Sequence, residues 1–87
     1  MNSMTKPLVV MTRDTLKTQF EQGIVDALRK HGWGAALRLR QWTECYRYVD
    51  GKNVFDEVFA NLLRNDVIIV LGQTHAGVDV FGLHEEA

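Results

Sequence analysis

One cysteine and one proline occur among the 87 residues, and no long apolar run is present. The lone cysteine, Cys45, excludes an internal disulfide, so the sequence predicts a cytoplasmic protein rather than a disulfide-stabilised secreted one. The longest uninterrupted apolar stretch, residues 67–71, is far shorter than the ~20 residues that cross a bilayer. No secretory signal pattern precedes the first predicted helix, and we expect no association with a membrane.

The composition is that of one small globular domain, with 46% hydrophobic and 24% charged residues. The charges are unevenly distributed along the chain. Residues 1–49 contain eight basic and four acidic side chains, a net charge of +4, whereas residues 50–87 contain two basic and seven acidic ones, a net charge of −5. A chain with a basic half and an acidic half is suited to attract a polyanion or a second copy of itself.

The first predicted helix covers residues 12–31. Thr12 is the expected N-cap, Asp14 places a negative charge in the first turn, and Gly32 follows as a helix stop. Gly23, in the middle of the helix, indicates close packing against another helix. Residues 1–11 precede the helix as an N-terminal arm whose apolar end, residues 8–11, is expected to pack or to dimerise.

The pattern changes after Gly32. Leu37 and Leu39 alternate with Arg38 and Arg40, which predicts a short strand that forms the third member of a small sheet. A short second helix over residues 41–49 is expected next, because apolar residues recur there at helical spacing. The Asp-Gly pair at 50–51 leaves a hairpin as the alternative for this stretch. The apolar positions of the expected helix are Trp42, Cys45, Tyr46 and Val49.

The third predicted helix covers residues 53–65, with Asn53 as its N-cap. It leads into a β-hairpin with strands over residues 67–71 and 78–83 and a loop over residues 72–77; residues 84–87 form a polar tail. The buried stripe of the helix is expected to contain Phe55, Val58, Phe59, Leu62 and Leu63.

This order of elements resembles the winged-helix superfamily, and the resemblance covers residues 12–83. It implies an α+β fold of three helices with a C-terminal β-hairpin wing and a short third strand. In that superfamily the third helix enters a DNA groove and the wing lies beside it. The resemblance implies a DNA-binding protein, and we expect a transcriptional regulator of double-stranded DNA that acts as a homodimer, because one module of this size makes too few contacts for tight specific binding. By this match Lys52, Asn53, Asn61 and Arg64 would face DNA, Gln73, Thr74 and His75 would form the wing tip, and Gln41, Thr43 and Arg47 would approach the DNA backbone from the second helix. Arg38 and Arg40, the outward cations of the preceding predicted strand, are added to this set as DNA-binding candidates.

The charges of the third helix support an alternative function. Residues 50–66 contain two basic and four acidic side chains, a net charge of −2, and the wing has no Lys or Arg. Glu57 is expected on the exposed face, where it would repel phosphates. The alternative is therefore a protein-interaction module, an accessory subunit or inhibitor of a nucleic-acid-binding enzyme, that uses the acidic helix 53–65 and does not bind DNA.

No arrangement of residues predicts an enzyme, a cofactor or a metal site. Cys45 has no histidine at helical spacing and is interpreted as a core residue. The spacings of the three histidines match no zinc motif. Trp42, Tyr46 and Tyr48 alternate with arginines, a set that could stack on exposed bases or could simply belong to the core and its solvated rim.

Overall fold

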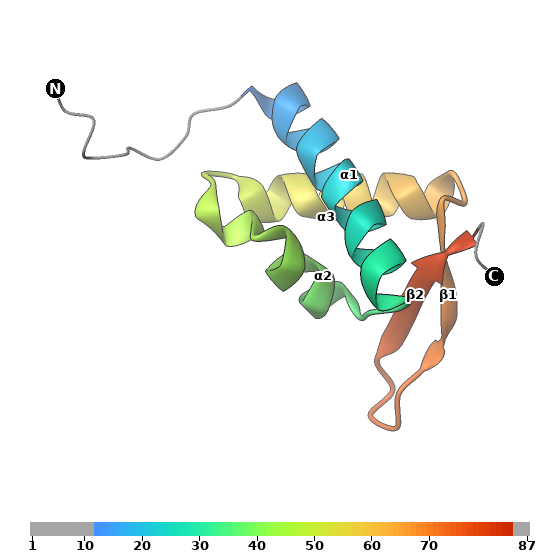
Figure 1. The fold of residues 1–87 in the computed structure, drawn as a ribbon. Coiled ribbons are helices and arrows are strands. Elements are labelled where there is room, and N and C mark those ends of the chain that lie inside the picture. Colours follow the sequence, from blue (N-terminus) through green and yellow to red (C-terminus); the bar gives the residue numbers. More distant parts are fainter. Residues whose placement is uncertain (1–11, 85–87) are drawn as a thin grey trace, which may run out of the picture.

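A computed structural model describes residues 12–84 of the protein (Figure 1). The predicted arm, residues 1–11, and the last three residues of the predicted tail lie outside the described residues. The elements in chain order are helix α1 (Arg13–His31), helix α2 (Ala36–Thr43), the 3-10 turn η1 (Cys45–Arg47), helix α3 (Gly51–Arg64) and strands β1 (Ile68–Gln73) and β2 (Asp79–Leu83).

Helix α1 has the limits that the sequence predicts. The Thr12 hydroxyl accepts a hydrogen bond from the Thr15 backbone N–H, and the chain leaves the helix at Gly32, whose φ of 87° suits a residue without a side chain. The predicted packing at Gly23 is also present: a Cβ atom there would lie 3.1 Å from Cγ2 of Thr43, so α1 and the end of α2 are in close contact. The buried face of α1 consists of Leu16, Phe20, Ile24 and Leu28.

The predicted strand at residues 37–40 is wrong, because these residues form the first half of α2. Leu39 is fully buried, whereas Leu37 is 64% exposed, so the two leucines do not share a face. Leu, Arg and Gln are strong helix formers, and an alternation of only four residues does not outweigh that preference. The third strand is reduced to one bridge residue, Gly34, which exchanges two hydrogen bonds of 3.0 and 2.8 Å with Phe81 of β2.

The predicted second helix over residues 41–49 is also misplaced. Helix α2 ends at Thr43, because Glu44 adopts a left-handed conformation with φ of 56° and η1 follows. Cys45 is therefore buried as expected, but Tyr46 and Val49 are exposed instead of continuing a helical stripe.

Helix α3 begins at Gly51, so Asn53 lies in its first turn and is not the N-cap. The hairpin alternative for residues 50–51 is wrong, since Asp50 occupies the N-cap position with φ of 65°. The early start reflects close packing of Gly51 under the Cys45 carbonyl, a contact between residues that local sequence signals do not report. The buried positions of α3 are Val54, Phe55, Val58 and Leu62, with Phe59 and Leu63 partly buried.

Strands β1 and β2 form the predicted antiparallel hairpin, shifted by one or two residues. Ile68 pairs with Leu83 and Val70 with Phe81, and the register shifts between Val70 and Gly72, which leaves Leu71 as a bulge. Figure 1 shows α1 lying across α3, α2 below the pair, and the hairpin extending beyond the helices from the end of α3. The result is a small α+β domain of three helices and a two-stranded sheet, a layout compatible with the winged helix.

Candidate nucleic-acid interface

The outer face of α3 is polar and accessible. Asn53, Ala60 and Arg64 follow one another along it, and Lys52 lies exposed in the first turn. Within the described residues, Lys52 has no hydrogen bond or ion pair. Asn61 is half-buried and accepts a 2.6 Å hydrogen bond from Nη1 of Arg64. Of the four α3 residues that the resemblance assigned to DNA, Asn53 and Arg64 therefore lie on this face and Asn61 at its edge, whereas Lys52 lies about 100° from Asn53 around the helix axis.

The acidic side chains of α3 are neutralised from the other two helices. Glu57 accepts from Nη2 of Arg13 at 2.9 Å and from Nζ of Lys17 at 2.8 Å, both on α1. Asp56 pairs with Arg40 of α2. The sequence analysis predicted Glu57 on the exposed face without an ion-pair partner, whereas in the structure it pairs with two cations. The face of α3 is consequently less repulsive to phosphate than the local charge count implies.

The ion pairs also change the protonation of Glu57. Hydrogen bonds from Lys17 and then from Arg13 hold the pKa of the Glu57 carboxyl below its usual range. Because the folded-state pKa is lowered, the stabilisation is present above the unfolded value of about 4.3 and is lost as the pH falls through the lower folded value.

Glu57→Gln is therefore expected to lower the free energy of unfolding at neutral pH, with a difference from the natural protein that shrinks as the pH falls through the folded pKa of Glu57. Urea unfolding over a series of pH values measures this difference. Glu21→Gln is the matched control, because Glu21 is exposed and has no ion pair among the described residues. The two variants should diverge only at neutral pH; identical pH profiles would contradict the role of the α1 cations.

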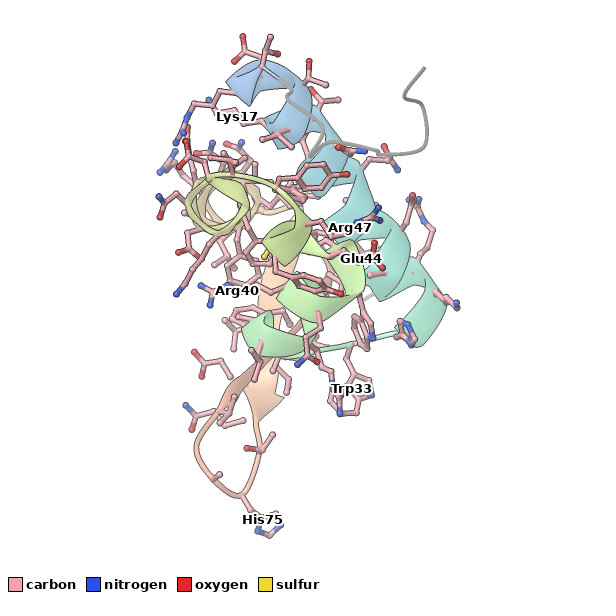
Figure 2. The ribbon with its side chains drawn as sticks, turned by 90° about the vertical axis from the view of Figure 1, so that its left-hand side faces the viewer. Lys17, Trp33, Arg40, Glu44, Arg47 and His75 are labelled. Atoms are coloured by element: carbon pink, nitrogen blue, oxygen red, sulfur yellow. The ribbon has the colours of Figure 1, made fainter. Side chains whose placement is uncertain are left out.

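Three of the predicted contact residues near the second helix already have partners within the protein, two of them partly buried and Arg47 at the surface. The guanidinium of Arg40 pairs with Asp56 and lies 5.6 Å from the centre of the Phe55 ring. The Thr43 hydroxyl donates to the Leu39 carbonyl at 2.8 Å and is partly buried. Arg47 pairs with Glu44 at 2.7 Å, as the adjacent labels in Figure 2 mark. Arg40 and Thr43 thus have structural roles.

Arg38 and Gln41 differ from these three. Both are exposed on α2, and Arg38 has no hydrogen bond or ion pair among residues 12–84. Arg38 is therefore the cation of α2 that is most available to a ligand.

Two of the three predicted DNA-binding residues at the tip of the hairpin, Gln73 and Thr74, form side-chain hydrogen bonds within the hairpin. The Gln73 amide donates to Asp79 at 2.8 Å, and the Thr74 hydroxyl accepts from the Val78 N–H at 3.2 Å. His75 projects from the end of the hairpin (Figure 2) and is exposed. The tip is hence ordered by Gln73 and Thr74, and His75 is the side chain that it presents.

Trp33 is an exposed aromatic residue that the sequence analysis did not identify as a candidate for binding. Trp33 is 58% exposed and lines a surface hollow together with His31, Gly34, Arg38 and Trp42. The ring of Trp42 stacks on that of His31 with centroids 3.9 Å apart. The sequence offered no signal for this hollow, because it depends on α2 starting directly after the bridge at Gly34. The other two aromatic residues considered for base stacking do not line this hollow. Tyr48 packs edge-on against Phe20, and Tyr46 is exposed on η1.

Cys45 and the potential metal ligands are the remaining features with possible site chemistry. Burial raises the pKa of the Cys45 thiol, which belongs to the core. Among residues 12–84, no three His, Cys, Asp or Glu side chains gather in a way that could hold a metal ion. None of the helices in this described part has the length and apolar character needed to cross a membrane.

Comparisons with known proteins add no relative. No family model, no curated protein and no solved structure matches the chain.

Proposed function

We propose that the protein is a small winged-helix regulator that binds duplex DNA through α3. The observation that carries this proposal is the neutralisation of Asp56 and Glu57 by cations from α1 and α2. It leaves the outer face of α3 as a row of polar, small and cationic side chains around an ion-paired Glu57, a surface that suits a DNA groove.

The polar and small residues of this face match groups that DNA presents in its grooves. Asn side chains donate to and accept from adenine, and a small residue such as Ala60 permits close approach to a thymine methyl group. Lys52 and Arg64 lie near opposite ends of a helix about 21 Å long and on different sides of it, so each would meet a different phosphate beside the groove. Arg38 and His75 would extend the contacts from α2 and from the hairpin tip.

The proposal includes a homodimer. One small module makes few contacts, and dimers of such modules bind two half-sites one helical turn apart. The outer edge of β1 supports this part of the proposal, because within the described residues it is unpaired and no charged side chain occurs from Val67 to Gln73. An uncharged open edge is a common site of association between copies.

Fluorescence anisotropy on a blunt DNA duplex tests the function. We expect binding at low salt that weakens steeply between about 50 and 200 mM salt, because each contacted phosphate releases counterions. Light scattering of the same complex should give two protein copies per duplex. Absence of binding at low salt would overturn the proposal, and one copy per duplex would remove the dimer from it.

The second candidate is a module that binds a protein. It is favoured by the exposed apolar side chains Val70, Leu71 and Val78 on a hairpin that has no Lys or Arg from Ile68 to Leu83. Exposed apolar residues that cluster on one element are typical of protein interfaces. A folded protein that ignores duplex DNA at low salt would favour this candidate.

A further inference from the structure

A hollow lies where α1, the bridge residue and α2 meet, and the ring of Trp42 in its lining is closely packed. Trp42 stacks almost parallel to His31, with an angle of 8° between the rings. Trp42 also packs against the backbone of Gly34, where a Cβ atom would lie only 2.8 Å from Cζ3 of the indole. Two contacts therefore fix the Trp42 ring in place, and the glycine is required for one of them. We call this site, lined by His31, Trp33, Gly34, Arg38 and Trp42, the Trp33 hollow.

The remaining two side chains of the Trp33 hollow are free to meet a ligand. Trp33 has more than half of its surface exposed, and in Figure 2 it projects from the helices on the side of the hairpin. Arg38 is exposed and, among the described residues, unpaired. It also lines the neighbouring hollow between α2 and the hairpin, together with Ala35, Leu37, Gln41 and Val78. Among residues 12–84, no carboxylate lines either hollow.

These groups define the chemistry of the ligand. An exposed indole favours a flat partner, and an unpaired guanidinium free of neighbouring carboxylates favours an anion, above all a phosphate. A nucleotide in a single strand offers both, because its base has an open face and its phosphate lies close by. In a duplex the faces of the bases are stacked inside the helix and cannot reach an indole on a protein surface.

We propose that the Trp33 hollow binds an unpaired nucleobase of single-stranded DNA, with Trp33 as the stacking surface and Arg38 on the adjoining phosphate. The inference rests on the proposed function for its setting, since the unpaired base would belong to an end or gap of a duplex held by α3. It adds a preference for duplexes with a single-stranded extension, which α3 alone would not give.

The first experiment compares three labelled probes by fluorescence anisotropy: a blunt duplex, the same duplex with a short adenine overhang, and a free oligoadenylate strand of DNA. We expect the overhang to tighten binding about tenfold over the blunt duplex, as one stacked base contributes in other proteins. Trp33→Ala should remove this gain and leave binding of the blunt duplex unchanged, while Trp33→Phe should retain part of it.

Leu37→Ala is the matched control. Leu37 is exposed to a similar extent as Trp33 and lies nearby on α2, but it does not line the Trp33 hollow. It should keep the overhang preference. Circular dichroism of each variant checks that the fold is intact, which the exposure of both residues leads us to expect.

Tryptophan fluorescence gives an independent readout of the stacking. The protein has two tryptophans, so Trp42→Phe leaves Trp33 as the reporter while keeping an aromatic ring on His31. Addition of the oligoadenylate should quench this emission. Arg38→Gln should reduce the salt dependence of oligoadenylate binding by about 0.7, the value for one contact in a single strand.

The outcomes separate the two proposals. If the blunt duplex is not bound but the oligoadenylate quenches Trp33, the proposed duplex binding fails and the base site stands. If the blunt and extended duplexes bind equally well, or if Trp33→Ala and Leu37→Ala weaken binding to the same extent, the base site is overturned and duplex binding stands. If no probe binds, both are overturned.

Discussion

Gly51→Ala is expected to lower the free energy of unfolding by about 3 kcal/mol or more, at the upper end of what overpacking costs. A Cβ atom at position 51 would lie 1.8 Å from the carbonyl oxygen of Cys45 and 2.9 Å from its carbonyl carbon. Both are backbone atoms, so no side chain can rotate away to relieve the clash. Either η1 or the first turn of α3 has to move, and both are held by buried neighbours.

Gly72→Ala is the control for this substitution. Gly72 lies in β1, and a Cβ atom there would meet no atom within 4 Å. The same chemical change should shift the free energy of unfolding by less than about 0.5 kcal/mol, as is usual for surface sites. Urea unfolding of both variants provides the comparison. Equal free energies of unfolding for the two variants would contradict the prediction, because they would show that the turn before α3 can shift to accommodate the added methyl group without loss of stability.

The turn at Gly51 also connects stability with the candidate site. Gly51 is the first residue of α3, and its N–H donates to the Tyr48 carbonyl at 3.0 Å. Asn53, two residues further on, begins the outer face proposed to meet DNA, and Lys52 lies in the same turn. A shift in this turn would therefore displace the first contacts of that face, and Gly51→Ala should weaken duplex binding even where the protein remains folded.

The elements predicted correctly are those whose signals are local. Helix α1 contains an N-cap, a first-turn acid and a stop glycine within its own sequence, and the structure uses all three. The hairpin is marked by two β-branched and apolar runs around a glycine-bracketed loop. By contrast, residues 36–43 offered only four alternating positions, and helix propensity together with the burial of Leu39 decided against a strand.

The electrostatics of the site depended on contacts that no local pattern reports. Arg13 and Glu57 are 44 positions apart, and Arg40 and Asp56 are 16 apart. A count of charges along residues 50–66 treats both acids as exposed and unpaired, and so overstates the repulsion. Only the packing of α1 and α2 against α3 brings the cations to them. The Trp33 hollow was missed because residues 37–40 were predicted to form a strand, whereas its members come together only when α2 starts directly after Gly34.

The second large effect is expected from the two cations of α3. Replacing Lys52 and Arg64 together by glutamine should weaken duplex binding about sixtyfold near 0.1 M salt, because each lost phosphate contact costs roughly eightfold there. The slope of log K against log salt should fall by about 1.8 in magnitude. Both side chains are exposed, and the bond between Arg64 and Asn61 stays on the surface, so the fold should tolerate the change.

Lys30→Gln supplies the control for net charge. Lys30 is an exposed cation in the last turn of α1, away from the outer face of α3. Its loss changes the overall charge by one unit without removing a proposed phosphate contact, so binding should weaken less than about twofold and the salt slope should hardly change. If Lys30→Gln lowers the slope by half as much as the double substitution, the protein binds DNA through diffuse attraction, and α3 has no special role in it.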